Sequence, residues 1–150
     1  MNMLRNNDAV SISVGFILTF AVTVLIFSTI MISFYSLSSS YEEQAMRESF
    51  RMLGCGLAAK ITTVDTIINI THSMGGKVNT FEYEFTLPIT IADNSYSIEI
   101  SNKEITIESD NIEAWIPINT SINIEEKTIY SNAEDYKIIY KENNITIEKQ

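Results

Sequence analysis

Side chains that carry out catalysis or hold metal ions are scarce in this sequence. Its 150 residues include one cysteine, Cys55, one histidine, His72, two prolines and five glycines. A lone cysteine excludes a disulfide within the chain, and a lone histidine excludes a histidine-rich metal site. The glycines form no phosphate-binding loop. We expect a buried thiol at Cys55, with an intermolecular bridge as the alternative, a surface histidine at His72, and no cofactor, metal or enzyme activity.

Positive charge is also scarce. The chain has 10 lysine and arginine residues against 19 aspartate and glutamate residues, a formal net charge of −9. Residues 1–40 contain only Arg5 and Asp8 as charged side chains, so the negative excess lies beyond them. Nucleic-acid-binding domains typically carry a strong excess of positive charge, and this acidic sequence lacks such a footprint. We therefore expect no nucleic-acid partner, and a solvated surface for most of the carboxylates.

Charge is absent from one long segment, residues 10–37, which is mostly apolar. As a helix this segment would extend about 42 Å, more than the roughly 30 Å of a bilayer's hydrocarbon core. The pattern predicts a transmembrane helix in contact with membrane lipid. Arg5 precedes the segment and Glu42 and Glu43 follow it, which favours a cytoplasmic amino terminus and an extracytoplasmic carboxyl-terminal part.

Small and hydroxylated residues recur every four positions within this segment, at Ser11, Gly15, Thr19 and Thr23. Residues with this spacing lie along one side of a helix, and small side chains there allow helices to approach closely in lipid. The alternative is that the hydroxyl groups simply bond to carbonyl groups of their own helix. The sequence leaves both interpretations open.

The next part of the chain, residues 38–74, has the pattern of an amphipathic helix. Ser40 and Glu43 have the Ser-x-x-Glu spacing of a helix start, so we expect the helix to restart there after a hinge. Apolar residues then recur every 3.67 residues on average, which predicts a helix lying against a sheet of its own domain. They are Met46, Phe50, Leu53, Leu57, Ile61, Val64 and Ile68. Gly54 and Gly56 mark either a bend or a close backbone contact.

From residue 75 the period changes to two, as in Phe81, Tyr83 and Phe85, which alternate with glutamates. Such alternation predicts antiparallel strands with one buried face. The strand-like runs are residues 81–85, 96–100, 104–108, 114–118, 127–130, 136–140 and 145–147. We expect the first three of these runs to form a meander and residues 142–144 to form a hairpin turn. The strand that contains Pro117 should lie at an edge or contain a bulge.

The predicted fold class is therefore α+β: a long amino-terminal helix, first transmembrane and then amphipathic, followed by an antiparallel β-sheet or sandwich head. The expected organisation is a short leader or cytoplasmic tail (1–9), a transmembrane helix (10–37), a helical stalk and loop (38–74) and an extracytoplasmic β domain (75–150). Three Asn-x-Ser/Thr sequons, at Asn69, Asn119 and Asn144, could accept glycans outside the cytoplasm, although a chain rich in these residues also produces sequons by chance.

One short stretch resembles a known family. Its residues are Ala9, Val10, Ser11, Val14, Gly15, Phe16, Ile17 and Leu18, and they follow a short leader that contains Arg5. This stretch resembles the amino terminus of archaeal type IV pilin-like proteins. The resemblance implies leader processing by a membrane peptidase near Ala9 and Val10, a hydrophobic helix packed in a filament core, and an outward β-rich head. Asp8 and Ile12 depart from the family's usual basic residue and proline, so a permanently anchored protein remains as credible as a processed subunit.

The sequence thus leads to two functional hypotheses. The first is a pilin-like structural or assembly protein of the cell surface, which associates with copies of itself or with other pilin-like subunits through the hydrophobic helix. The alternative is a single-pass membrane protein whose acidic β domain binds a ligand or partner outside the cell.

Overall fold

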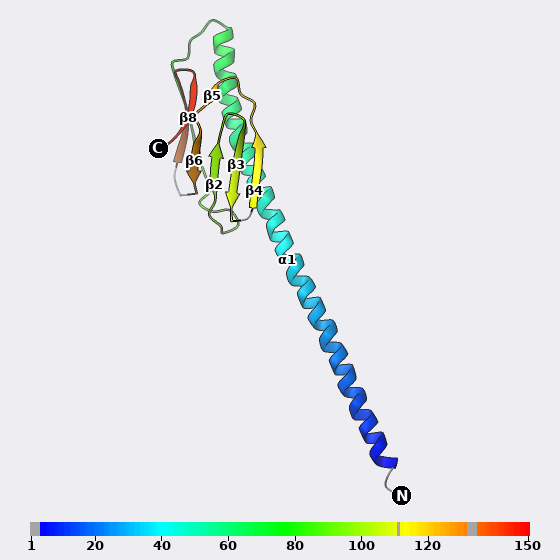
Figure 1. The fold of residues 1–150 in the computed structure, drawn as a ribbon. Coiled ribbons are helices and arrows are strands. Elements are labelled where there is room, and N and C mark those ends of the chain that lie inside the picture. The colour runs from blue at the N-terminus through cyan, green and yellow to red at the C-terminus, as the bar shows by residue number, and fades with distance from the viewer. Residues whose placement is uncertain (1–3, 111, 132–134) are drawn as a thin grey trace. The chain divides into compact units, whose positions relative to one another are not determined.

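The computed structural model describes residues 4–110, 112–131 and 135–150, with side chains from residue 13 onward in those ranges. The chain is divided into two compact units, Met1–Glu42 and Glu43–Gln150. The elements in chain order (Figure 1) are α1 (Leu4–Ser73), β1 (Thr80–Thr86), β2 (Ser97–Ile100), β3 (Glu104–Ser109), β4 (Ile112–Pro117), β5 (Asn123–Ile124), β6 (Lys127–Tyr130), β7 (Asp135–Lys141) and β8 (Asn144–Lys149). The expected α+β fold is confirmed.

The helix α1 is continuous over 70 residues. The expected restart at Ser40 is wrong, because the Ser40 hydroxyl donates to the carbonyl oxygen of Ser36 at 3.0 Å, inside the helix. A capping serine instead accepts a hydrogen bond from one of the free N–H groups at a helix start, and no such groups exist in mid-helix. The Ser-x-x-Glu spacing is therefore only a local coincidence.

The end of α1 is closed by backbone hydrogen bonds. The N–H of Gly75 donates to the carbonyl of His72 at 3.0 Å, and the N–H of Gly76 donates to that of Thr71 at 2.9 Å. Gly75 has a φ of +80°, the left-handed conformation that glycine adopts without strain. These bonds form a Schellman motif, which satisfies carbonyl groups that the last turn leaves without a partner.

Two four-stranded sheets follow the helix. Their strand orders are β1-β7-β8-β5 and β4-β3-β2-β6. All pairs are antiparallel except β5 and β8, which are parallel. The head thus consists of two sheets rather than one. Pro117 ends β4, which lies at an edge as expected, and a proline at an edge leaves no ladder hydrogen bond unmade.

The expected meander holds only for β2 and β3, which pair with each other, and β4 continues it. β1 pairs with β7 instead of β2, and Phe85 lies opposite Tyr136. The connection from β1 to β2 crosses between the sheets. It contains Pro88, which has no N–H to donate, and a tight turn between Ile91 and Asn94. The turn residues between β1 and β2 therefore do not form a hairpin that pairs these two strands.

The hairpin between β7 and β8 is confirmed. Lys141 pairs with Asn144, and the two residues between them, Glu142 and Asn143, have φ values of 52° and 66°. Positive φ at both central residues defines a type I′ turn, whose twist matches that of the flanking strands. Asn144 belongs to β8 rather than to the turn.

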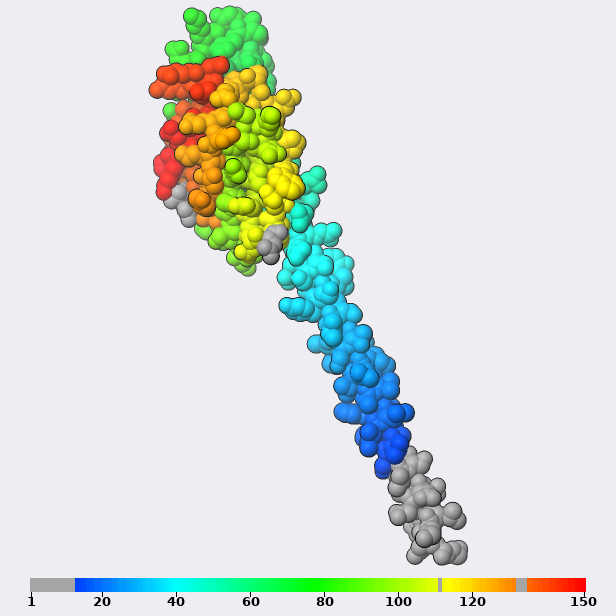
Figure 2. All heavy atoms as spheres, viewed as in Figure 1, coloured from blue at the N-terminus to red at the C-terminus, as the bar shows by residue number. Residues whose placement is uncertain are grey.

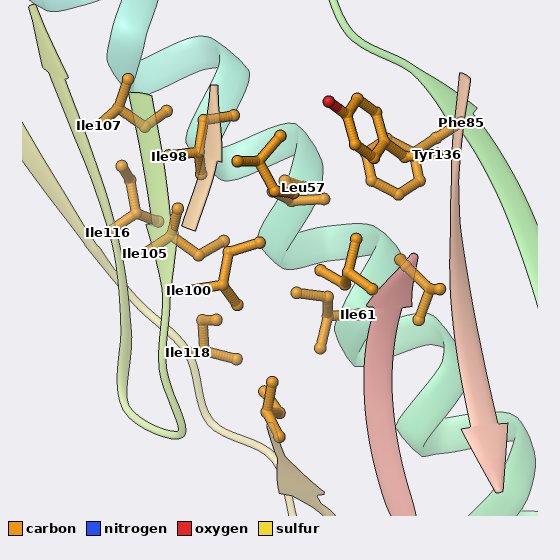
Figure 3. Packing of buried hydrophobic residues seen from close by; sticks show 14 of the residues in the cluster. Leu57, Ile61, Phe85, Ile98, Ile100, Ile105, Ile107, Ile116, Ile118 and Tyr136 are labelled. Atoms are coloured by element: carbon orange, nitrogen blue, oxygen red, sulfur yellow. The ribbon is translucent and has the colours of Figure 1, made fainter. Parts of the chain in front are cut away.

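One hydrophobic core fills the unit Glu43–Gln150. The helix contributes its predicted apolar face, and Phe50, Ile61 and Val64 have no exposed surface. Side chains of the sheet β4-β3-β2-β6 point toward Leu57 and Ile61 of the helix (Figure 3). The prediction that this part of the helix lies against a sheet of its own domain is confirmed.

The helix packs tightly against that sheet at Gly54. A Cβ atom at this position would lie 2.3 Å from Cδ1 of Ile116 and 3.3 Å from Cδ1 of Ile107, whereas one at Gly56 would meet nothing within 4 Å. The helix continues through both positions. Of the two readings for the glycines, close backbone contact is correct for Gly54, and Gly56 lies on the open side of the helix.

Candidate functional site: an exposed apolar helix and the surface of the acidic unit

The first described part of α1 exposes apolar side chains on all sides. The exposed large hydrophobic residues between 13 and 37 are Val14, Phe16, Ile17, Leu18, Phe20, Val22, Val24, Leu25, Ile26, Phe27, Ile30, Met31, Ile32, Phe34, Tyr35 and Leu37. Among the described residues, α1 is the one helix long and apolar enough to cross a membrane, and its most apolar window is not buried at all. Leaving so many large apolar side chains in water is costly, because burying each one gains about 1.5–3 kcal/mol.

The predicted stripe of small residues is present on this segment. The Thr19 hydroxyl donates to the Gly15 carbonyl at 2.9 Å, and the Thr23 hydroxyl donates to the Thr19 carbonyl at 2.8 Å. Ser28, Thr29 and Ser33 make the same type of bond four residues back. These are the internal bonds of the second interpretation. A role of the stripe in helix packing stays a prediction.

The leader and its processing position fall outside what the structure describes in full. The side chains of Ala9, Val10 and Ser11 belong to the undescribed residues. Cleavage near Ala9 and Val10, and participation of Ser11 in the stripe, therefore stay predictions from the sequence.

The three sequons occupy different local structures. Asn69 lies on α1, and its side-chain N–H donates to the Ser121 hydroxyl at 2.6 Å. Asn119 is exposed in the connection between β4 and β5. Asn144 begins β8 and accepts a hydrogen bond from Asn123 at 3.4 Å. Glycosylation of each stays a prediction.

Cys55 is exposed, so the expected buried thiol is wrong. Residues five apart on a helix point about 140° apart, and Phe50 faces the core, so Cys55 faces away from it. His72 is also exposed, in the last turn of α1. In the described part of the chain, no group of three or more histidine, cysteine, aspartate or glutamate side chains could hold a metal ion.

A buried carboxylate, Asp65, is a feature that sequence reasoning missed. It is 7% exposed, and its Oδ1 atom accepts hydrogen bonds from the Ser121 hydroxyl at 2.8 Å and from the N–H groups of Ser121 and Ile122 at 3.1 Å each. These bonds offset the cost of burying the charge and fix the connection between β4 and β5 to the helix. The only signal in the sequence is an acidic residue next to Val64 on the apolar face.

A shallow hollow of about 380 Å³ lies where β2, β3 and β6 meet the loops that precede and follow them. It is lined by Ser95, Tyr96, Ser97, Glu108, Ser109, Asp110, Tyr130 and Ser131. Ser97 donates to Glu108 at 3.1 Å, and Tyr130 is 68% exposed. Burial, reinforced by the nearby Tyr136, raises the pKa of Tyr96 to about 12, so this phenol stays neutral at physiological pH. The hollow is shallow and open to solvent.

A second hollow, of about 250 Å³, lies between α1 and β4. Its lining includes Arg47, Arg51, Glu48, Glu113 and Trp115. Arg47 donates to the backbone carbonyl of Glu113 at 3.0 Å, and the Trp115 indole N–H donates to the Glu113 carboxylate at 3.0 Å. The side chain of Trp115 is 62% exposed. This hollow brings together two arginines and an exposed tryptophan on a unit that is otherwise acidic.

Comparison with known proteins yields one match. No curated protein and no solved structure matches this chain. The family model of DUF7266, a family of unknown function, matches residues 5–147 and so covers the helix and both sheets. The chain therefore belongs to the DUF7266 family.

Proposed function

We propose that this protein is a pilin-like structural or assembly protein of the archaeal cell surface. In this proposal residues 10–37 anchor the chain in the membrane and pack with the same segment of other copies or of related subunits. The amino terminus is cytoplasmic, and the acidic unit is extracytoplasmic.

One observation carries the proposal. The unit Glu43–Gln150 fills its core with its own side chains, the first of which is Met46. The apolar residues between 13 and 37 contribute none of the buried side chains among the described residues. They are not needed for the fold of the acidic unit, so lipid or other helices are the environment that suits them.

The hydrogen bonds of this segment agree with such an environment. In lipid each polar group needs a partner within the protein, and Thr19, Thr23 and Ser28 bond to carbonyl groups of their own helix. The outer surface of the segment then presents apolar and small groups, which favour close helix packing by van der Waals contact. The resemblance of residues 9–18 to archaeal pilin-like proteins supplies the idea of a filament.

The proposal is tested by enlarging one residue on the stripe. We expect Gly15→Leu to lower energy transfer between fluorescently labelled copies in lipid vesicles severalfold, because the larger side chain keeps the helices apart. Ala21→Leu is the matched control. Residues two apart on a helix point about 200° apart, so Ala21 lies opposite Thr19 and Thr23, and its enlargement should leave the transfer unchanged.

Native protein provides the second arm of the test. Amino-terminal sequencing should find a chain that begins near Val10, and shearing of cells should release it in filaments. An intact Met1 on a protein that stays monomeric and membrane-bound would overturn the subunit proposal. That result would support the alternative, an anchored acidic domain that binds a ligand or partner.

A further inference from the structure

We propose that the acidic units of two copies of this chain bind each other, with Arg47 and Arg51 of each copy contacting Glu99, Glu104 and Glu108 of the other. This contact is separate from packing of the apolar helix. It follows from two surface patches on the unit Glu43–Gln150, a basic one and an acidic one.

The basic patch consists of Arg47 and Arg51, which line a hollow together with Gln44, Glu48, Glu113, Ala114 and Trp115. The two arginines are one helical turn apart and exposed. Within the described part of the chain neither guanidinium forms an ion pair with a carboxylate. Arginine and tryptophan are the residues most enriched in the energetically important centre of protein interfaces.

The acidic patch lies on the outer face of the sheet β4-β3-β2-β6. Glu104, Thr106 and Glu108 alternate with buried isoleucines on β3, and Glu99 lies opposite Thr106 on β2. Three carboxylates thus surround one threonine. Like charges on neighbouring positions of one sheet face repel one another, and none of the three is ion-paired within the described residues. In Figure 2 no other element covers this face of the sheet.

The two patches have matching dimensions. Arg47 and Arg51 are separated by about 6 Å along the helix axis, and diagonal neighbours on a sheet, such as Glu99 and Glu104, are about 7–8 Å apart. Guanidinium groups pair with carboxylates through two parallel hydrogen bonds. A second copy therefore offers each arginine the carboxylate partner that its own chain lacks.

Trp115 makes the contact reciprocal. It lies opposite Thr106 in the register of β3 and β4, so it adjoins the acidic patch, and it also lines the basic hollow. When two copies face each other across Trp115, the basic patch of each copy meets the acidic patch of the other. A contact of this type is isologous, the commonest symmetry among homo-oligomers.

The inference is tested by exchanging the charges. Full-length R47E/R51E and full-length E99K/E104K are each prepared alone in lipid vesicles. A third sample contains equal amounts of both variants, one of them isotopically labelled. Each variant alone places like charges against each other, whereas the mixture restores both pairings. Carbodiimide should then link positions 47 or 51 of one variant to positions 99 or 104 of the other, and mass spectrometry identifies the linked peptides as intermolecular.

A matched control and the salt dependence complete the test. K77E/K141E also adds two carboxylates but places them outside both patches, so its mixture with E99K/E104K should give severalfold fewer links from positions 77 or 141 to positions 99 or 104. High salt should lower the yield of the expected links severalfold, because exposed charges are screened. Absence of the links between positions 47 or 51 and positions 99 or 104 from the R47E/R51E mixture, or an equal yield of the control links from positions 77 or 141, would overturn the proposed contact. The apolar helix is unchanged in every variant, so this result would leave the proposed packing in lipid standing.

Discussion

Tyr96 holds several parts of the acidic unit together. Its ring lies 6.3 Å from that of Phe50 on the helix, and its hydroxyl donates to the carbonyl of Pro88 in the connection from β1 to β2. Its backbone N–H donates to the Ser131 hydroxyl at 3.0 Å. With only 4% of its surface exposed, the phenol is a buried polar group with a partner, as buried polar groups generally are.

The raised pKa of Tyr96 predicts how stability changes at alkaline pH. Its ordinary value of 10.0 applies to the unfolded chain, and its value in the fold is about 12. Below pH 10 both states are protonated and the contribution is constant. Between pH 10 and about 12 the unfolded state loses the proton first, so stability falls, by on the order of 3 kcal/mol at about 1.4 kcal/mol per pKa unit.

Urea denaturation of the full chain at a series of pH values checks this prediction. Tyr96→Phe should flatten the decline between pH 10 and 12, and it should lower stability at neutral pH by about 1 kcal/mol through loss of the bond to Pro88. Tyr130→Phe is the control, since Tyr130 is 68% exposed. An unchanged alkaline decline in the Tyr96 variant would contradict the assignment.

At the scale of elements, α1 is one helix with two kinds of surface. Between residues 13 and 37 its large apolar side chains are exposed. From Met46 to Ile68 it buries one side against the core, and the opposite side carries polar residues and Cys55. The same backbone hydrogen bonds continue through both parts, so the difference lies wholly in which side chains the sequence places on each side.

The glycines of this helix predict a contrast between two substitutions. Gly54→Ala should lower stability by about 1–3 kcal/mol, because its Cβ would overlap Ile116 in a packed core. Gly56→Ala should raise stability by about 0.5–1 kcal/mol, because alanine favours the helix and meets nothing within 4 Å. Chemical denaturation of both variants measures the difference. Equal effects would show that Gly54 is not a contact point.

At the scale of the whole molecule, the described buried side chains all belong to the unit Glu43–Gln150. Its two sheets and the second part of α1 share one hydrophobic core. Each sheet also has charged outer positions, such as Glu82 and Lys137, which form an ion pair at 3.4 Å. A unit with its own core and a charged surface has what an independent domain requires.

We therefore expect residues 43–150, expressed alone, to stay in solution without detergent and to unfold cooperatively in urea. The full chain should require detergent or lipid, since its apolar residues between 13 and 37 are exposed. Circular dichroism and centrifugation of both proteins check this difference. Aggregation of the shorter protein, or its gradual unfolding, would show that the remainder of the chain is needed for the fold.

The sequence by itself determined the features that depend on neighbours along the chain. A charge-free apolar run gave the candidate membrane helix, the 3.67-residue spacing gave the buried side of the helix, and alternation gave seven of the eight strands. The turn at Glu142 and Asn143 and the edge position of Pro117 were also predictable, because both depend on local backbone chemistry.

Only the tertiary structure decided which distant segments meet. The pairing of β1 with β7, the short parallel strand β5, the contact of Gly54 with Ile116 and the bonds of Asp65 to residues 121 and 122 all join positions far apart in sequence. A period of 3.6 or 2 shows that a face is buried but does not say against what. For that reason the sequence predicted the elements, and the fold alone revealed the two patches that carry the proposed contact between copies.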